Sequence, residues 1–137
     1  MYEYTVLEVA RVVDGDTLDF VIDLGFSTFK KERIRVGGID APESRTRDLA
    51  EKKLGLEAKD YLQRSLAAAQ KILIQTEKED KYGRFLGWLY LDGASVSINE
   101  KMINEGYAWA YDGGTKAKDL SQLEVLRRQF DTWIEAE

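Results

Sequence analysis

Residues 4–24, YTVLEVARVVDGDTLDFVIDL, decide how the fold begins. Residues 4–13 are rich in β-branched side chains, and residues 17–24 repeat that composition, as strands do. Between them Asp14, Gly15 and Asp16 have the composition of a tight turn. The stretch therefore predicts one strand and a second strand that returns beside it.

Outward from this pair, three more strands and three helices are predicted. Residues 29–36 predict a third strand, and residues 71–76 and 84–90 predict a hairpin. Apolar residues at helical spacing predict helices over 54–70 and 118–134, and Ser97 precedes a short helix that ends near Gly106. The polar residues 44–53 lack periodicity and indicate a surface loop. This order is typical of a mainly β, α+β fold, a five-stranded barrel of the oligonucleotide-binding (OB) kind with three helices.

Length and composition fit a single domain over residues 1–137. A hydrophobic share of 44% and a charged share of 33% are typical of a soluble globular protein. No apolar stretch approaches the roughly 20 residues that span a membrane. The start has no secretion signal, so we expect a cytoplasmic protein, or a secreted one if the chain is a trimmed mature domain. We also expect a monomer.

The chain has no cysteine and no histidine, which narrows the possible chemistry. Disulfides, thiolate nucleophiles, zinc–sulfur sites and catalysis through histidine are excluded. The remaining catalytic groups are carboxylates, amines, guanidiniums, hydroxyls, or a metal held by oxygen. Oxygen ligands favour hard ions such as calcium, magnesium or manganese.

Positive charge is concentrated in one segment of an acidic chain. The net charge is −5, which argues mildly against nonspecific binding to a polyanion. Residues 30–53, however, carry eight positive and five negative side chains. Arg45 and Arg47 in this segment are suited to capturing a polyanionic substrate, and they fit a solvated mobile loop equally well.

Three short segments carry residues suited to catalysis, and each has a plain structural explanation. The turn DGDT (residues 14–17) has the composition of an ordinary β-turn. In RVGGIDAPE (35–43), the proline stiffens the corner that holds Asp40 and Glu43, yet soluble acids around a proline turn also fit. DKYGR (80–84) fits a hairpin turn followed by a solvated arginine.

Taken together, these segments resemble the thermonuclease family, of the staphylococcal nuclease type. The matching motifs are VDGDT (13–17), RVGGIDAPE (35–43), DKYGR (80–84) and NEGYA (104–108). They stand in the order and spacing of the family, and the resemblance runs from about residue 6 to residue 133. It implies the family fold, which is the barrel with three helices expected above.

The resemblance also implies three groups of site residues. Those implied to bind calcium, through two carboxylates and one backbone carbonyl, are Asp16, Asp40 and Ala41. Those implied to act in catalysis are Glu43, which orients or deprotonates the attacking water, and Arg35 and Arg84, which grip the scissile phosphate. Those implied to line the nucleotide site are Lys81, Tyr82 and Tyr111. Ala41 departs from the family, where threonine is frequent, so a backbone ligand survives and a hydroxyl contact is lost.

The implied function is a calcium-dependent endonuclease that hydrolyses DNA and RNA with low sequence specificity and leaves 3′-phosphates. A dication neutralises charge that grows on the phosphate, and two arginines present paired N–H donors to its oxygens. The alternative is a non-catalytic nucleic-acid-binding module, because some repeats of the family kept the barrel and lost the acids. All the acids and arginines named above are present in this chain, which favours the enzyme.

The sequence also predicts the surroundings of several aromatic residues and of two aspartates. Tyr82 and Tyr111 stand beside polar turns, where base stacking is credible. Asp19 and Asp23 alternate on one face of a predicted strand and are expected to be solvated. The aromatic residues expected to pack in the core are Phe20, Phe29, Phe85, Trp88, Phe130 and Trp133.

Overall fold

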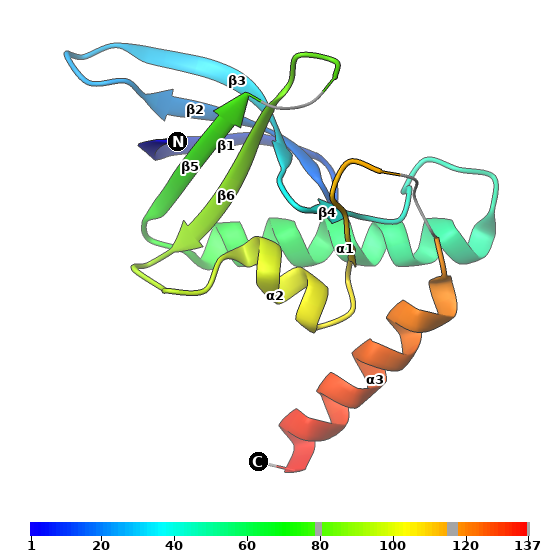
Figure 1. Cartoon of the computed structure of the whole chain (residues 1–137). Coiled ribbons are helices and arrows are strands. Elements are labelled where there is room, and N and C mark those ends of the chain that lie inside the picture. Colours follow the sequence, from blue (N-terminus) through cyan, green and yellow to red (C-terminus); the bar gives the residue numbers. More distant parts are fainter. Residues whose placement is uncertain (79–80, 115–117, 137) are drawn as a thin grey trace.

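Five strands close into a barrel (Figure 1) in the order β1-β2-β3-β6-β5. The computed structural model describes residues 1–78, 81–114 and 118–136, with the side chains of the last helix as far as residue 132. The β3–β6 pair is parallel, and the other barrel pairs are antiparallel. The predicted five-stranded, mainly β barrel with three helices is therefore confirmed. The barrel strands are β1 (Tyr2–Asp14), β2 (Thr17–Asp23), β3 (Phe29–Val36), β5 (Ile72–Lys78) and β6 (Phe85–Leu91).

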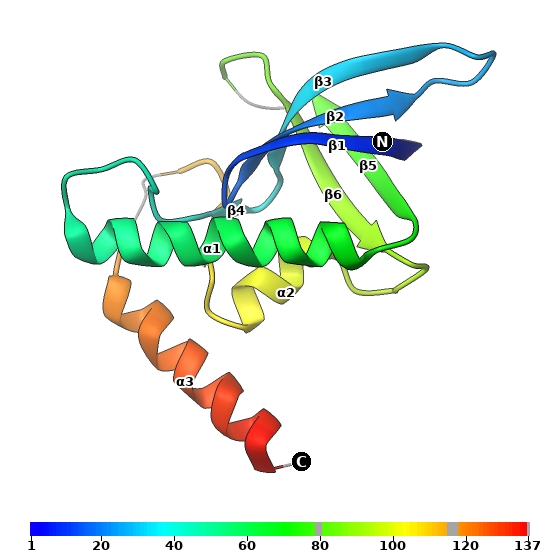
Figure 2. The same cartoon turned by 180° about the vertical axis from the view of Figure 1, so that it is seen from behind.

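The core lies between the inward faces of these strands and two helices. Phe20, Ile34 and Leu89 from the barrel are completely buried, because alternate residues of a strand point inward. Helix α1 (Leu49–Ala68) adds Leu62, and helix α2 (Ile98–Asn104) adds Met102. Figure 2 shows α1 lying across one end of the barrel with α2 beside it. In the part of the chain that the structure describes, no helix is long and apolar enough to cross a membrane.

Helix α1 begins at Leu49, so the predicted loop over 44–53 is wrong from that residue onward. The carboxylate of Asp48 caps the helix by accepting from the backbone N–H groups of Ala50 and Glu51, at 3.1 and 3.2 Å. Leu49 is exposed, and the first buried side chain of the helix is Leu54. The first turn therefore has no apolar face, and hydrophobic periodicity cannot reveal it.

A two-stranded ribbon beside the barrel joins distant parts of the chain. It pairs β4 (Ile39–Asp40) with β7 (Trp109–Ala110), and Asp40 lies opposite Trp109. The backbone N–H of Tyr111 donates to the carbonyl of Gly38 at 2.8 Å. Strands of two residues are too short to show a sequence pattern, and the ribbon is not predicted. Helix α3 (Leu120–Ala136) follows it.

The β2–β3 hairpin extends beyond the barrel (Figure 1), and two predictions about it are wrong. Phe29 is 58% exposed, because its place opposite Asp23 puts it on the outer face, away from the core. Asp19 is only 9% exposed, because Nε of Arg33 donates to its Oδ1 at 2.8 Å. Asp80 and the side chain of Trp133, both used in the sequence analysis, lie outside the described part of the chain.

Candidate active site

An arginine and two carboxylates converge where strand β3 ends. Nη2 of Arg35 lies 3.5 Å from Oδ1 of Asp40 and 3.7 Å from Oδ2 of Asp16. Arg35 is 7% exposed and Asp40 is 3% exposed, so these charges interact largely out of water. Three of the predicted site residues are thus brought together at one point.

Strand register explains why residues far apart in the sequence meet here. Thr17 lies opposite Arg35 in the β2–β3 pair, which places the preceding turn residue, Asp16, beside the end of β3. In the parallel β3–β6 pair, Phe85 lies opposite Ile34. The loop that precedes β6 therefore lies beside the second half of β3, close to the cations of its outer face.

Hydrogen bonds to backbone groups hold the converging side chains. Nη1 of Arg35 donates to the carbonyl of Ile39 at 2.9 Å. Oδ2 of Asp16 accepts from the backbone N–H of Ala41 at 3.0 Å, and its Oδ1 accepts from the hydroxyl of Thr17 at 3.1 Å. The turn after β1, the end of β3 and the segment 39–41 are locked together, and the charged groups have little freedom to move.

The oxygen atoms of this centre suit a hard divalent cation. Asp16 and Asp40 lie close to the same guanidinium nitrogen, and Ala41, whose carbonyl is the third predicted ligand, donates its N–H to Asp16. Calcium accepts carboxylates, backbone carbonyls and waters together. Among the described residues there is no group of three or more acidic side chains placed to hold a metal. Any cation held here would depend on the carboxylates of Asp16 and Asp40, with carbonyl oxygen or water as further ligands.

Glu43 follows Asp40 and Ala41 on the same stretch of chain, at its exposed rim, and is contacted from two sides. Its side chain is 48% exposed, and Nζ of Lys118 lies 3.8 Å from its Oε1. Its backbone N–H donates to Oε2 of Glu51 at 2.9 Å, and the same oxygen lies 3.1 Å from Nζ of Lys118. Partial burial raises the pKa of Glu43, and the nearby Lys118 ammonium opposes that rise. A carboxylate with a raised pKa is better suited to accept a proton during a reaction.

The backbone of Glu43 rests directly on helix α1 at Gly55. A Cβ atom at Gly55 would overlap the carbonyl oxygen of Glu43 and the backbone nitrogen of Ser44. That same N–H of Ser44 donates to Oδ1 of Asp14 at 3.3 Å. Glycine inside a helix costs about 1 kcal/mol relative to alanine, so this close approach explains its presence.

Two arginines and two tyrosines line one cavity of about 590 Å³. The guanidinium carbon of Arg35 lies 5.4 Å from the centre of the Tyr111 ring. On the loop before β6, the guanidinium carbon of Arg84 lies 5.4 Å from the centre of the Tyr82 ring, and Nζ of Lys81 lies 5.5 Å from it. The cavity thus brings together the two arginines that the resemblance implies for the phosphate and the three residues that it implies for the nucleotide.

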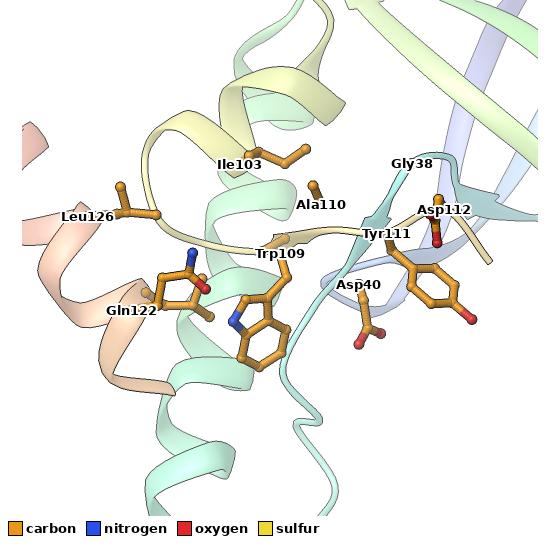
Figure 3. Close-up of a pocket in the computed structure, with 11 residues that line it drawn as sticks. Gly38, Asp40, Ile103, Trp109, Ala110, Tyr111, Asp112, Gln122 and Leu126 are labelled. Atoms are coloured by element: carbon orange, nitrogen blue, oxygen red, sulfur yellow. The ribbon is translucent and has the colours of Figure 1, made fainter. Parts of the chain in front are cut away.

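A second cavity of about 520 Å³ lies beside the β4–β7 ribbon, toward α3. Figure 3 shows the side chain of Asp40 between the rings of Trp109 and Tyr111 in this view. Both cavities are lined by Tyr111 and Asp112, so they are neighbours. The carboxylate of Asp40, although almost buried, therefore borders an open space and not the solid core.

Asn99 and Gly55 support the site, and no predicted role was attached to either of them. Nδ2 of Asn99 donates to the carbonyls of Gly37 and Gly87 at 2.7 and 2.9 Å, and its Oδ1 accepts from the N–H of Leu89 at 3.0 Å. Asn99 thus anchors the glycine segment after Arg35 to strand β6. The sequence signal for Asn99 is a polar residue on the otherwise apolar side of the short helix α2. Gly55, inside a helical pattern, is a second signal, since a glycine there usually has a packing reason.

Comparison with known proteins places the chain in a family. A family model described as staphylococcal nuclease homologue matches residues 33–130. Micrococcal nuclease of Shigella flexneri is 32% identical over 137 aligned residues, covering 92% of this chain and 72% of that protein. Thermonuclease of Staphylococcus hyicus is 34% identical over 124 residues, covering 89% of this chain and 69% of that protein. Protein ParB of Escherichia coli is 32% identical over 125 residues, and this chain spans 64% of its length. The chain belongs to the staphylococcal nuclease family.

Proposed function

We propose that this protein is a metal-dependent nuclease that hydrolyses phosphodiester bonds in DNA and RNA. The observation that carries the proposal is the double role of Arg35, which lies against the buried carboxylate of Asp40 and the partly buried one of Asp16 and lines the same cavity as Arg84. The carboxylate oxygens suited to a cation and the guanidinium N–H donors suited to a phosphate therefore lie next to each other at Arg35. The names of the related micrococcal nuclease and thermonuclease support the same activity.

Arg35 and Arg84 bind the phosphate in this proposal. A guanidinium presents paired N–H donors in a planar fork that matches phosphate oxygens. Attack by water increases the negative charge on those oxygens, and donors already in position stabilise it without rearranging. Arg35 is in position before substrate binds, because its Nη1 is bonded to the Ile39 carbonyl.

Glu43 orients the attacking water and accepts its proton. The carboxylate is half-exposed at the rim, where water reaches it, and partial burial raises its pKa. Both properties suit a general base, which must be accessible and must hold a proton once it has taken one. Gly55 and Glu51 fix the backbone of Glu43, so the carboxylate approaches from a defined direction.

Calcium is the ion that we propose for the centre, held by Asp16, Asp40 and the carbonyl of Ala41. When bound, such an ion neutralises part of the phosphate charge and makes the phosphorus a better electrophile. The chain itself keeps the two carboxylates together through Arg35 and orients Asp16 through Thr17.

Low sequence specificity follows from the groups that line the cavity. Cations contact phosphates, and aromatic rings stack on any base, so neither reads a base edge. We propose endonucleolytic cleavage that leaves 3′-phosphates. The same lining favours no particular sequence around the cleaved bond.

Digestion of single- and double-stranded DNA and RNA in calcium, magnesium or EDTA tests the proposal. We expect cleavage that requires the cation and falls about 10²–10³-fold in Arg84→Ala, the loss typical of one transition-state donor. Arg128→Ala, on the exposed side of α3, is the matched control and keeps full activity. Full activity in EDTA would contradict the proposal. So would binding without cleavage in every buffer, which would indicate a non-catalytic binding module.

A further inference from the structure

The outer face of strand β3 carries a row of cations that leads away from the proposed site. Side chains alternate along a strand, so Lys31, Arg33 and Arg35 point to one face. Ile34 and Val36 are completely buried, which shows that the cations stand on the outer face. Neighbouring cations of the row are separated by two residues, about 6.6 Å along the strand at a rise of roughly 3.3 Å per residue.

The cations beyond Arg35 are available to a ligand. Lys31 is exposed, and the side chain of Arg33 is 53% exposed. Arg33 donates from Nε and Nη2 to the carboxylate of Asp19, at 2.8 and 3.2 Å. Because a guanidinium has five N–H donors, these two bonds orient Arg33 and leave donors for a further acceptor.

Positive charge exceeds negative charge around this pair. Arg11, which is exposed, lies opposite Asp19 in the β1–β2 register. The hydrogen bond from Arg33 holds the pKa of Asp19 below its usual value, with the charges of Lys31 and Arg11 adding to the effect. Three cations thus lie around Asp19, and the carboxylate of Asp23, opposite Phe29, lies on the same face nearer the tip.

Two exposed phenyl rings stand at the far end of the row. Phe29 is the next residue on the same face after Lys31, and Phe26, in the turn, is fully exposed. Phe26 and Ser27 are the central residues of the β-turn that the bond from the N–H of Thr28 to the carbonyl of Gly25 closes, and their φ values of 53° and 59° normally favour Asn, Asp or Gly. Formation of the turn therefore does not explain a phenylalanine at this position, and strained residues of this kind are frequent at functional sites.

We propose that the hairpin face formed by Arg33, Lys31 and Phe29, with Phe26 at its tip, binds the single-stranded part of a nucleic acid beyond the scissile phosphate. Surfaces that bind single strands combine a basic track for the backbone with aromatic rings for unpaired bases. The track begins at Arg35, so it is continuous with the cavity, and the hairpin carries it beyond the barrel (Figure 1). The identity of the ligand rests on the proposed function.

The proposal also accounts for the uneven charge of the chain. Residues 30–53 hold a positive excess although the net charge is −5. Part of this excess is the row on β3, which starts at the proposed site. Contacts to successive phosphates would favour cations at every second residue of the outer face, which is where Lys31, Arg33 and Arg35 stand.

Fluorescence anisotropy of a labelled single-stranded DNA oligonucleotide, in EDTA to prevent cleavage, tests this surface. We expect Phe29→Ala to raise Kd about 5- to 100-fold, the range for loss of one base–aromatic stack. Lys31→Ala should lower the slope of log Kd against log salt by about 0.7, the value for one lost phosphate contact on a single strand. Both losses should be smaller with a dinucleotide, which is too short to reach the hairpin.

Lys30→Ala is the matched control, because it removes the same charge from the same strand. Lys30 is exposed on the opposite face of β3 and pairs with Glu32 at 3.1 Å. We expect this variant to bind the oligonucleotide as the unmodified protein does. Equal weakening by Lys30→Ala and Lys31→Ala would overturn the proposal, since only net charge would then matter.

Vesicles of phosphatidylserine separate the proposal from membrane binding, which exposed phenylalanines beside lysines also suit. Vesicle binding that is lost in Phe26→Ala and Phe29→Ala, with unchanged affinity for the oligonucleotide, would overturn the proposal. Failure of the unmodified protein to cleave any nucleic acid would overturn the proposed nuclease function alone, because the affinities are measured without cleavage.

Discussion

Nη2 of Arg35 lies 3.5 Å from Oδ1 of Asp40, and both residues are nearly inaccessible to water. Removal of one partner of a buried ion pair typically costs about 3–5 kcal/mol, and here Asp16 and Lys118 also act on the charge that is left. The pair is therefore a structural element as well as part of the proposed site. Variants must be chosen so that the two roles are separated.

Arg35→Lys keeps the charge and removes the planar fork. We expect kcat/KM for single-stranded DNA to fall roughly 10²–10³-fold, since lysine cannot present paired donors to a phosphate. The free energy of unfolding, measured with urea, should fall by less than in Arg35→Ala, which removes the positive charge nearest to Asp16 and Asp40. A lysine variant with the full rate would show that the fork does not act on the substrate.

Calcium should stabilise the folded protein through Asp40. A ligand that binds only the folded state raises its stability by about 2.7 kcal/mol at a hundred times Kd, so thermal unfolding with and without calcium measures the interaction. In Asp40→Asn the shift in Tm should shrink markedly. Asp19→Asn is the matched control, because Asp19 is also nearly buried beside an arginine but lies outside the centre. Equal shifts in the two variants would place the ion elsewhere.

Gly55→Ala should lower activity although alanine is the better helix former. Helix propensity alone favours alanine by about 1 kcal/mol. The added methyl group, however, overlaps the carbonyl oxygen of Glu43 and must displace it. We expect a lower kcat/KM and no gain in the free energy of unfolding. Leu56→Ala, at the exposed neighbouring position, should keep full activity, and an active, more stable Gly55→Ala protein would refute this account.

Tyr61 gives the fold a dependence on alkaline pH. Its hydroxyl donates to Oε2 of Glu105 at 2.9 Å, and burial, reinforced by that carboxylate, raises the pKa of Tyr61 far above its ordinary value of 10.0. A raised pKa in the folded state means that the neutral phenol stabilises the protein fully below pH 10.0. That stabilisation is lost as the pH rises above this value toward the folded-state pKa.

Urea unfolding of Tyr61→Phe at several pH values measures this contribution. At neutral pH the variant should be less stable by about 1–3 kcal/mol, because the nearly buried Glu105 loses a partner. Above pH 10 the stability of the unmodified protein should fall more steeply than that of the variant, so that the two curves approach each other. Parallel curves would mean that Tyr61 titrates alike in the folded and unfolded states.

Local patterns predicted the strands well and failed where an element leaves the core. Strand β3 has the predicted bounds, since the apolar Ile34 and Val36 stand on either side of the charged Arg35 at its end. The first turn of α1 is exposed, so it carries no apolar signal, and its true start depends on the Asp48 cap. Phe29 was predicted to be buried because aromatic residues usually are, but the hairpin extends past the barrel there.

The sequence indicates which residues form the candidate site and which of them are neighbours along the chain. Arg35 and Asp40 stand on one stretch, and their contact follows from the tight path of the chain between them. The approach of Asp16 depends on the register that puts Thr17 opposite Arg35, and no local pattern shows this pairing. Lys118, just before helix α3, contacts Glu43. Sequence spacing gives no sign of this contact.

Single-turnover cleavage of a DNA oligonucleotide by Glu43→Gln, in saturating calcium, tests the central claim most directly. Glutamine keeps the size and hydrogen-bonding capacity of the side chain but cannot accept the proton of the attacking water. The account predicts a rate about 10²–10⁴-fold lower, the usual contribution of a general base, with Kd for the oligonucleotide changed only a few-fold. Cleavage at the rate of the unmodified protein would contradict it.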